Sequence, residues 1–218
     1  CRDRNKIALQ SGILGANALG IKNILCITGD SVKAGDQQDA KAVHQFESVR
    51  LLKQIQAFNK GIDPTFGELP DKKTFIYAGA AADPSCRNQI SLEKRMRKKK
   101  EAGAQFVQTQ MVMEKENLME FCEKIAKPLD IPVIAGVFLL KSYKNALFIN
   151  KYVPGANIPD KILNRLKDAA DPLEEGIQIA AEQAQEFFNI ANGIHLMAVK
   201  MEHLIPDILE KADLNLEY

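Results

Sequence analysis

The 218-residue chain has few of the residues that build metal centres and disulfide frameworks. It contains four cysteines, none in a C-x-x-C pair, and three widely separated histidines. These residues are Cys1, Cys26, Cys86 and Cys122, with His44, His195 and His203. The first five residues are polar or charged, unlike a secretory signal. We therefore expect reduced thiols, no structural metal and a cytoplasmic location.

The chain also lacks an excess of charge of one sign and lacks long apolar runs. Its 29 basic and 28 acidic side chains give a formal net charge of +1, so we expect neither nucleic acid nor an anionic membrane as a partner. The longest apolar run, residues 133–140, is far shorter than the ~20 residues that span a bilayer. With 46% hydrophobic and 26% charged residues, the composition is typical of one globular domain, predicted here over residues 1–218.

Short apolar stretches alternate with segments of helical spacing along the chain. Strands are predicted at 21–27, 74–78, 105–110, 131–137 and 194–199. Helices are predicted at 7–19, 43–58, 91–101, 115–126, 142–150, 160–167, 171–192 and 203–212. This alternation predicts an α/β fold with a parallel sheet. The leading helix without a strand favours a (β/α)8 TIM barrel whose first strands lie upstream of Cys1, over an open doubly wound sheet.

Polar or small residues follow the predicted strands at their carboxyl ends, where α/β proteins bind ligands. Asp30 follows Gly29 after the first strand, although an aspartate there is most often a cap or turn residue. Gln110 ends the third strand. The small residues at 79–82 leave room for a ligand across the backbone, or they allow tight packing against the next helix. These strand ends are the candidate site.

A run of cationic side chains, residues 94–100, lies on the predicted helix 91–101. Such a run is usually a solvated helix face. Phosphate binding is the more specific alternative, because lysine and arginine form strong charge-assisted hydrogen bonds with phosphate oxygens.

Seven short motifs together resemble methylenetetrahydrofolate reductase. They are residues 1–5, 19–21, 27–30, 102–106, 108–110, 132–137 and 153–155. Each is weak alone, but they occur in the order and at the spacing of that family. The Cys-Arg-Asp-Arg-Asn opening and the Thr-Gly-Asp motif are most similar to the branch that contains acetogen enzymes. That branch includes reductase modules fused behind a homocysteine methyltransferase.

The resemblance implies a flavin-bearing barrel enzyme of one-carbon metabolism. Such enzymes reduce 5,10-methylenetetrahydrofolate to 5-methyltetrahydrofolate by hydride transfer from reduced flavin. The expected cofactor is FAD, with FMN as an alternative. NAD(P)H, ferredoxin or an electron-transfer subunit recharges the flavin, so we expect an oligomer or a complex.

The resemblance also assigns roles to individual residues. It implies that Asp30 is catalytic, stabilising a 5-iminium cation of the folate while touching both flavin and folate. It implies that Gln110, and more remotely Asn145, bind folate. The implied flavin contacts are Thr28, Gly29, Asp30, Gly79, Asp83, Arg95, Lys98 and Lys99, with the three basic residues near the phosphates.

The chain departs from the family pattern in three places. Thr28 stands where well-studied members have arginine, and Gly79 and Asp83-Pro84 stand where they have an aromatic residue and His-Pro. These two changes leave FAD and FMN both open. The glutamate that ends the family's first strand is absent from these residues, so we expect the upstream strands to be missing.

Two other functions remain as alternatives. One is a non-catalytic or scaffolding barrel subunit of a larger one-carbon or electron-transfer complex. The other is a phosphate-binding barrel enzyme, which normally has a glycine-rich loop after its seventh or eighth strand. Gly193 and residues 200–202 are not a loop of that kind, so this second alternative is the weaker one.

Overall fold

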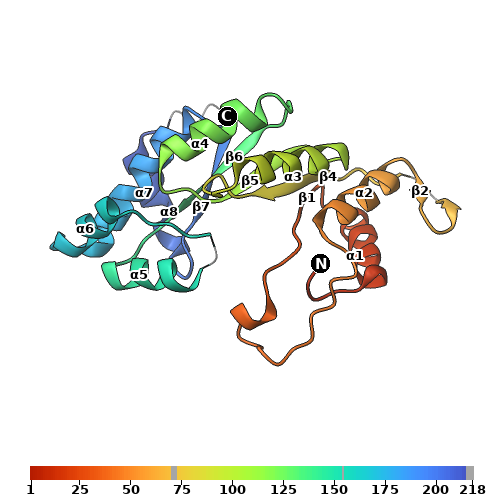
Figure 1. Cartoon of the computed structure of the whole chain (residues 1–218), viewed down its shortest axis with the longest axis horizontal. Helices are drawn as coiled ribbons and strands as arrows, with labels where there is room; N and C mark the ends of the chain where they lie inside the picture. Colours follow the sequence, from red (N-terminus) through yellow and green to blue (C-terminus); the bar gives the residue numbers. More distant parts are fainter. Residues whose placement is uncertain (70–72, 154, 215–218) are drawn as a thin grey trace. The chain divides into compact units, whose positions relative to one another are not determined.

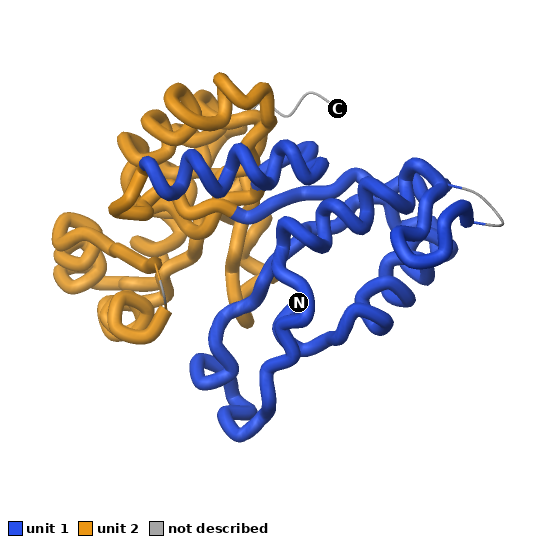
Figure 2. Tube along the Cα trace, turned by 45° about the vertical axis from the view of Figure 1, so that its right-hand side comes forward, with its two compact units in different colours: residues 1–81, 90–107 blue, residues 82–89, 108–218 orange. Residues whose placement is uncertain are grey.

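The computed structural model describes residues 1–69, 73–153 and 155–214 (Figure 1). The chain divides into two compact units. The first contains Cys1–Ala81 and Ile90–Val107, and the second contains Ala82–Gln89 and Gln108–Tyr218 (Figure 2). Pro154 of the 153–155 motif lies outside the described residues, as do residues 70–72 of the turn-rich segment before the second predicted strand.

The five predicted strands are all present and form one sheet. They are β1 (Asn23–Cys26), β4 (Tyr77–Ala82), β5 (Phe106–Met111), β6 (Val133–Phe138) and β7 (Gly193–Met197), in the order β1-β4-β5-β6-β7. Strand β1 pairs with β4 in parallel, and β6 pairs with β7 in parallel. The α/β class with a parallel sheet is therefore confirmed. In the described residues β1 and β7 are the sheet edges, so this part of the chain contains an open sheet that is consistent with part of a TIM barrel.

Helices follow the strands as predicted. They are α1 (Lys6–Ala18), α2 (Ser48–Asn59), α3 (Gln89–Glu101), α4 (Lys115–Phe121), α5 (Tyr143–Tyr152), α6 (Asp160–Asp168), α7 (Pro172–Phe188) and α8 (Ile205–Ala212). Short turns of other helix types are η1 (Val32–Ala34), η2 (Cys122–Ala126) and η3 (Glu202–Leu204). A small antiparallel hairpin of β2 (Ile62–Asp63) and β3 (Gly67–Glu68) had no clear signal in the sequence.

Three predicted elements have clearly misplaced boundaries. The second strand was placed at 74–78, but β4 runs from Tyr77 through the small residues to Ala82. Alanine and glycine have low strand propensity, yet they fit a strand that is crowded on both faces. Helix α2 begins at Ser48 rather than at 43, and α7 ends at Phe188 rather than at 192.

The two faces of β5 differ in polarity. Val107, Thr109 and Met111 are buried on one face, whereas Gln108 and Gln110 on the other are partly exposed. Strand β6 alternates in the same way over its first residues, and α7 packs against β6 and β7. Because side chains alternate along a strand, Gln108 and Gln110 lie on one face of β5 and the apolar Val107 and Met111 lie on the other.

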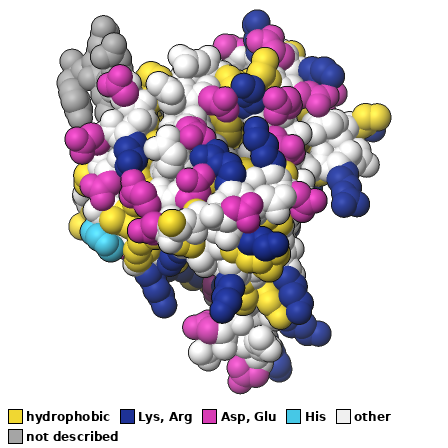
Figure 3. All heavy atoms as spheres, turned by 90° about the vertical axis from the view of Figure 1, so that its left-hand side faces the viewer, with side chains coloured by type: hydrophobic (Ala, Val, Ile, Leu, Met, Phe, Trp, Pro, Cys, Tyr) yellow, Lys and Arg dark blue, Asp and Glu magenta, His cyan; other side chains and the backbone are white. Residues whose placement is uncertain are grey.

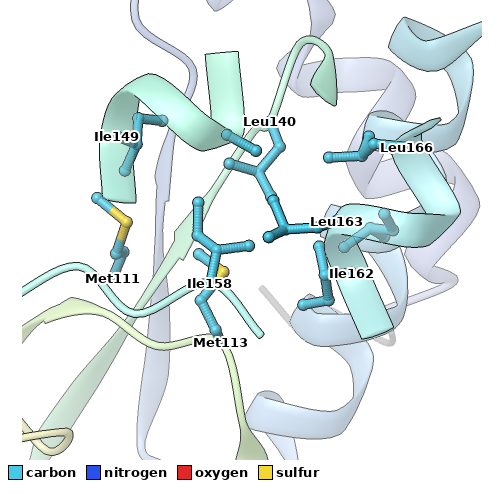
Figure 4. Close-up of a cluster of buried hydrophobic side chains, with 10 residues drawn as sticks. Met111, Met113, Leu140, Ile149, Ile158, Ile162, Leu163 and Leu166 are labelled. Carbon is cyan, nitrogen blue, oxygen red and sulfur yellow. The ribbon is translucent and has the colours of Figure 1, made fainter. Parts of the chain in front are cut away.

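The second unit contains a large apolar cluster on and beside α5 and α6. Its buried members are Met111, Met113, Leu140, Ala146, Ile149, Ile158, Ile162, Leu163, Leu166 and Ile179 (Figure 4). Met111 ends β5 and Met113 follows it, so this cluster holds the carboxyl end of β5 in place.

Charged side chains of both signs are intermingled on the face shown in Figure 3. This agrees with the nearly balanced composition. Within residues 1–69, 73–153 and 155–214, no helix combines the length and the apolar character that crossing a bilayer requires.

Candidate functional site

The end of β1 is tied to the start of α2 by Thr28. The Thr28 hydroxyl accepts a hydrogen bond from the backbone N–H of Ser48 at 3.1 Å and lies 3.3 Å from the Ser48 hydroxyl. The first N–H groups of a helix have no partner inside the helix, and the N-cap residue Glu47 makes no side-chain cap. Thr28 therefore has a local structural role in addition to its predicted flavin contact.

Gly29 has a backbone conformation that other residues rarely adopt. Its φ is +92°, and a Cβ there would lie 2.7 Å from the Cβ of Arg2. Arg2 in turn accepts a hydrogen bond at its carbonyl from the N–H of Val43 at 2.7 Å. Glycine is therefore required where the opening Cys-Arg-Asp motif passes the end of β1. This contact brings together two of the motifs that carry the family resemblance.

Asp30 is exposed, and no hydrogen bond or ion pair to its carboxylate occurs among the described residues. The charge of Asp30 acts on Arg2, whose pKa is raised mainly by its hydrogen bond to Asp3 and to a smaller extent by Asp30. The guanidinium of Arg2 bonds Asp3 at 2.6 Å. The carboxylate of Asp30 is therefore available to a cationic group of a ligand.

Lys99 on α3 reaches the end of β4. Its Nζ donates to the carbonyl of Ala81 at 2.6 Å. Burial lowers the pKa of Lys99, the positive charge of Arg95 lowers it further, and Glu47 acts in the opposite direction. A partly buried ammonium beside a second cation is a favourable place for an anion, because a negative charge would stabilise both.

The basic helix α3 separates into groups with different roles. Arg97 pairs with Glu93 at 2.8 Å on an exposed part of the helix, and Lys98 is exposed. Most of the cationic run is therefore a solvated face, as such runs usually are. Lys99, with Arg95 as its electrostatic neighbour, is the part that fits phosphate binding.

Gly79 lies inside β4 rather than at its exit. It is buried, and a Cβ there would overlap the ring of Phe106. Phe106 also stacks on Tyr77, with ring centroids 5.5 Å apart. Tight packing thus accounts for Gly79, against an aromatic ring of the neighbouring strand and not against the next helix. Its contact with a flavin stays a prediction.

Asp83 follows β4 and is half-buried. Its carboxylate accepts a hydrogen bond from the N–H of Ser85 at 3.0 Å. The same carboxylate lies close to Gly155, where a Cβ would be 2.9 Å from Oδ2. The structure thereby brings Asp83 to the end of the Val-Pro-Gly motif, within the second unit.

Gln110 is held at the end of β5 by backbone contacts. Its side-chain Oε1 accepts a hydrogen bond from the N–H of Met111 at 3.0 Å. The buried hydroxyl of Thr109 donates to the carbonyl of Gln110 at 2.7 Å and accepts from the N–H of Gly136 at 2.8 Å. The bond from Met111 orients the Gln110 side-chain amide, whose NH₂ group has no partner in the described part of the chain. The Thr109 bonds fix the backbone at the same point.

Asn145 caps the start of α5. Its Oδ1 accepts from the N–H of Lys141 at 3.2 Å, and its own N–H donates to the Ser142 hydroxyl at 3.2 Å. This reciprocal arrangement resembles a capping box. It explains Asn145 without a ligand, so its folate contact stays a prediction.

One polar pair was missed by sequence reasoning. Nε2 of Gln108 lies 2.7 Å from Nδ1 of His195, which joins β5 to β7. Burial lowers the pKa of His195. The signal that could have found Gln108 is its position two residues before Gln110, on the same strand face. Nothing in the sequence pointed to His195.

The predicted site residues lie at separate strand ends and helix starts. Thr28, Gly29 and Asp30 lie together at the end of β1, and Lys99 lies at the end of β4. Asp83, Gln110 and Asn145 belong to the second unit, each beside its own turn or helix start. The convergence of Asp30 and Gln110 on one ligand stays a prediction. In the described ranges, no cluster of three or more His, Cys, Asp or Glu side chains is placed to hold a metal ion.

Comparisons with known protein families and sequences agree with the resemblance. The family model described as methylenetetrahydrofolate reductase matches residues 1–213. Methylenetetrahydrofolate reductase 1 of Schizosaccharomyces pombe is 23% identical, over 98% of this chain and 35% of that protein. A probable methylenetetrahydrofolate reductase (NADPH) of Caenorhabditis elegans is 25% identical, over 98% of this chain and 31% of that protein. The chain thus spans about a third of the length of these curated relatives.

A solved structure shows a similar fold. It is an uncharacterized protein from Clostridium thermocellum, described as binding two copies of 5-methyl-5,6,7,8-tetrahydrofolic acid. The match has a TM-score of 0.58 and 18% sequence identity, and it covers 88% of this chain and 71% of the other.

Proposed function

The chain belongs to the methylenetetrahydrofolate reductase family, and from this premise we propose that it carries the reductase barrel of a flavoprotein. The proposed reaction is the reduction of 5,10-methylenetetrahydrofolate to 5-methyltetrahydrofolate. The observation that carries the proposal is the match of the family model to residues 1–213, which includes each strand end described above. The two folate molecules described for the structural neighbour are the product of this reaction.

Asp30 is proposed to stabilise the reacting cation. The imidazolidine ring of the folate must open to a 5-iminium ion before it accepts hydride. A carboxylate with no hydrogen-bond donor among the described residues can interact fully with that positive charge. Such preorganised electrostatic stabilisation contributes about 3 kcal/mol or more in a site that excludes water.

Gln110 is proposed to orient the pterin ring. Its Oε1 is already used by the backbone N–H of Met111, so the NH₂ group is left to donate. The edge of a pterin alternates hydrogen-bond acceptors and donors, and an oriented amide suits such an edge. The role of Gln110 in this proposal is binding and alignment.

The chain's residues fit a flavin nucleotide at the anion-binding end. The lowered pKa of Lys99, caused by burial and by Arg95, marks a place where a phosphate group would be stabilising. Thr28, Gly29 and Asp30 would border the ring system, and Lys98 would assist from the exposed side of α3. The cofactor, FAD or alternatively FMN, supplies the hydride, and the protein supplies position and polarity.

The proposed protein works in the cytoplasm with a source of electrons. That source is NAD(P)H or an electron-transfer subunit, and the latter implies a complex. These partners follow from the family and not from any surface described above.

The visible spectrum of the full-length protein tests the proposal. We expect bound flavin, with absorption near ~450 nm, because the cofactor carries the redox chemistry. An electron donor should bleach this band, and methylenetetrahydrofolate should restore it under anaerobic conditions. A colourless full-length protein that binds no added FAD or FMN would contradict the proposal and support the scaffolding alternative.

A further inference from the structure

The sheet face that carries Gln108 and Gln110 also contains a histidine to which the proposed reaction assigns no role. His195 lies on β7 and is half-buried. Its Nδ1 is 2.7 Å from the Nε2 amide nitrogen of Gln108 on β5. An amide nitrogen only donates hydrogen bonds. With the Gln108 amide nitrogen as the donor, Nδ1 accepts, and this contact corresponds to a neutral imidazole with its proton on Nε2.

The proton-bearing nitrogen of His195 has no protein partner among the residues that the structure describes. Among the described residues the Gln108 contact is the only hydrogen bond of the imidazole. Within the described ranges, the buried side-chain nitrogen and oxygen atoms without a partner are Nε2 of Gln54 and Oε1 of Gln183. Nε2 of His195 is not one of them, so it borders accessible space and can donate to a molecule there.

The intervening strand β6 has a glycine beside His195. His195 is paired in register with Gly136 of β6. A Cβ at Gly136 would lie 2.7 Å from the carbonyl oxygen of Gln110 and 3.0 Å from the Cε of Met197. Glycine is therefore required at this position, because the backbone of β5 and the terminal methyl group of Met197 already take up the space that a side chain would need.

The pair lies on the same sheet face as the amide proposed to bind folate. Gln108 and Gln110 are two residues apart on β5, so their side chains point to the same side. Both are partly exposed, whereas Thr109 between them is 4% exposed. This face therefore offers two hydrogen-bond donors, the NH₂ group of Gln110 on β5 and the Nε2–H of His195 on β7.

We propose that Gln108 and His195 form a second binding site on this sheet face. Gln108 holds the imidazole so that its Nε2–H donates a hydrogen bond to a carbonyl oxygen of a fused nitrogen heterocycle. Both rings of the proposed reaction, pterin and isoalloxazine, carry such a carbonyl. The inference rests on the proposed function, because that function supplies the class of ligand. In this arrangement His195 is a binding residue, and Gln108 is a positioning residue that acts through it.

The test begins with the state of the imidazole in the full-length protein labelled with ¹⁵N-histidine. We expect a His195 ring with an unprotonated Nδ1 and a protonated Nε2. We also expect the Nε2–H resonance to shift when either flavin or 5-methyltetrahydrofolate is added. A ring protonated on Nδ1 would overturn the inference. So would an Nε2–H resonance that moves with neither ligand.

Affinity measurements identify the ring. We expect His195→Gln to weaken one ligand by about tenfold, the effect of losing one hydrogen bond in a partly buried site. The variant is titrated with flavin and, separately, with 5-methyltetrahydrofolate. The ligand whose affinity falls is the one that His195 contacts. His203→Gln is the matched control, since His203 is exposed on the short turn η3. It should change neither affinity.

A second variant keeps the test decisive if His195→Gln fails to fold. Gln108→Leu retains the imidazole and removes its anchor, so we expect a mixture of ring tautomers and a smaller loss of affinity for the same ligand. If the wild-type protein binds flavin and folate and both variants bind them with unchanged affinity, the inference is overturned while the proposed function stands. A wild-type protein that binds neither ring would overturn the proposed function as well.

Discussion

The ends of β1 and β5 carry similar short polar sequences, Thr-Gly-Asp and Thr-Gln, but use them differently. At β1, Thr28 caps α2 and leaves the carboxylate of Asp30 exposed without a hydrogen-bond partner in the described ranges. At β5, Thr109 is buried and Gln110 is tied to Met111. A free carboxylate suits a charge that develops during reaction, whereas a fixed amide suits a ring that must be aligned.

Asp30→Asn tests the proposed role of the free carboxylate at the end of β1. The variant should keep flavin bound, but folate reduction should slow by about 100-fold, because a preorganised charge is lost from the reacting centre. Rapid anaerobic mixing of the reduced protein with methylenetetrahydrofolate, followed by flavin reoxidation, measures this step. Asp36→Asn, in the same loop and also exposed, is the control. An unchanged rate would remove Asp30 from the mechanism.

Gln110→Glu tests the proposed role of the fixed amide at the end of β5. The substitution replaces the free NH₂ donors with a carboxylate, so the affinity for folate should fall about thirtyfold, within the range for a lost and unpaired hydrogen bond. Flavin affinity should change less. Equilibrium titration of both ligands checks this, with Gln185→Glu on the exposed side of α7 as control. Equal losses for the two ligands would assign Gln110 a structural role.

The two threonines allow a stability test of the same contrast. Thr109→Val leaves the N–H of Gly136 buried without a partner, which should cost about 2 kcal/mol of unfolding free energy. Thr28→Val should cost about 1 kcal/mol, as for the loss of a helix cap that water can replace. Urea unfolding of both variants measures the difference. A larger cost for Thr28 would mean that the end of β1 is the more rigid of the two.

Lys99→Met tests the contribution of the end of β4. Its ammonium is partly buried and bonded to Ala81, so we expect flavin affinity to fall about tenfold when the charge is removed. Lys98→Met, the adjacent exposed lysine, should have a smaller effect because solvent screens its charge. Fluorescence titration of the apoprotein with FAD and with FMN measures both. Equal effects would indicate a diffuse electrostatic contribution of α3.

The smallest expected effect concerns pH. Burial lowers the pKa of His195 in the folded protein, so the unfolded chain takes up the proton more readily. Stability should therefore decrease as pH falls through the ordinary histidine value of about 6.5, and it should level off below the lowered value. His195→Gln should show a weaker decrease, whereas His203→Gln should follow the wild type. Urea unfolding at several pH values between 5 and 7.5 compares them.

Much of the fold was predictable because it depends on local patterns. Alternating apolar stretches and helical spacing predicted five strands and the helix that precedes them, and the structure contains all of these. Strand β4 was misplaced because its alanines and glycine have no strong strand signal of their own. They are accommodated by packing, with Phe106 occupying the space that a side chain at Gly79 would need.

The candidate site was predictable where a residue type is itself informative. The acid after Gly29 and the amide ending β5 were identified from their place after strands, and Lys99 from its place in a cationic run. The Gln108–His195 contact was not predictable, because the two residues are 87 positions apart and no motif contains both.

The sequence alone determined the alternation of strands and helices, the polar character of the strand ends and the family, because each of these is written in short-range order along the chain. Only the tertiary structure decided which polar groups are already satisfied. Thr28, Thr109 and Asn145 make their hydrogen bonds within the fold. In the described part of the chain, the carboxylate of Asp30, the NH₂ group of Gln110 and Nε2 of His195 have no hydrogen-bond partner. That division depends on which backbone N–H and C=O groups approach each side chain, and pairings between distant segments arise only when the chain folds.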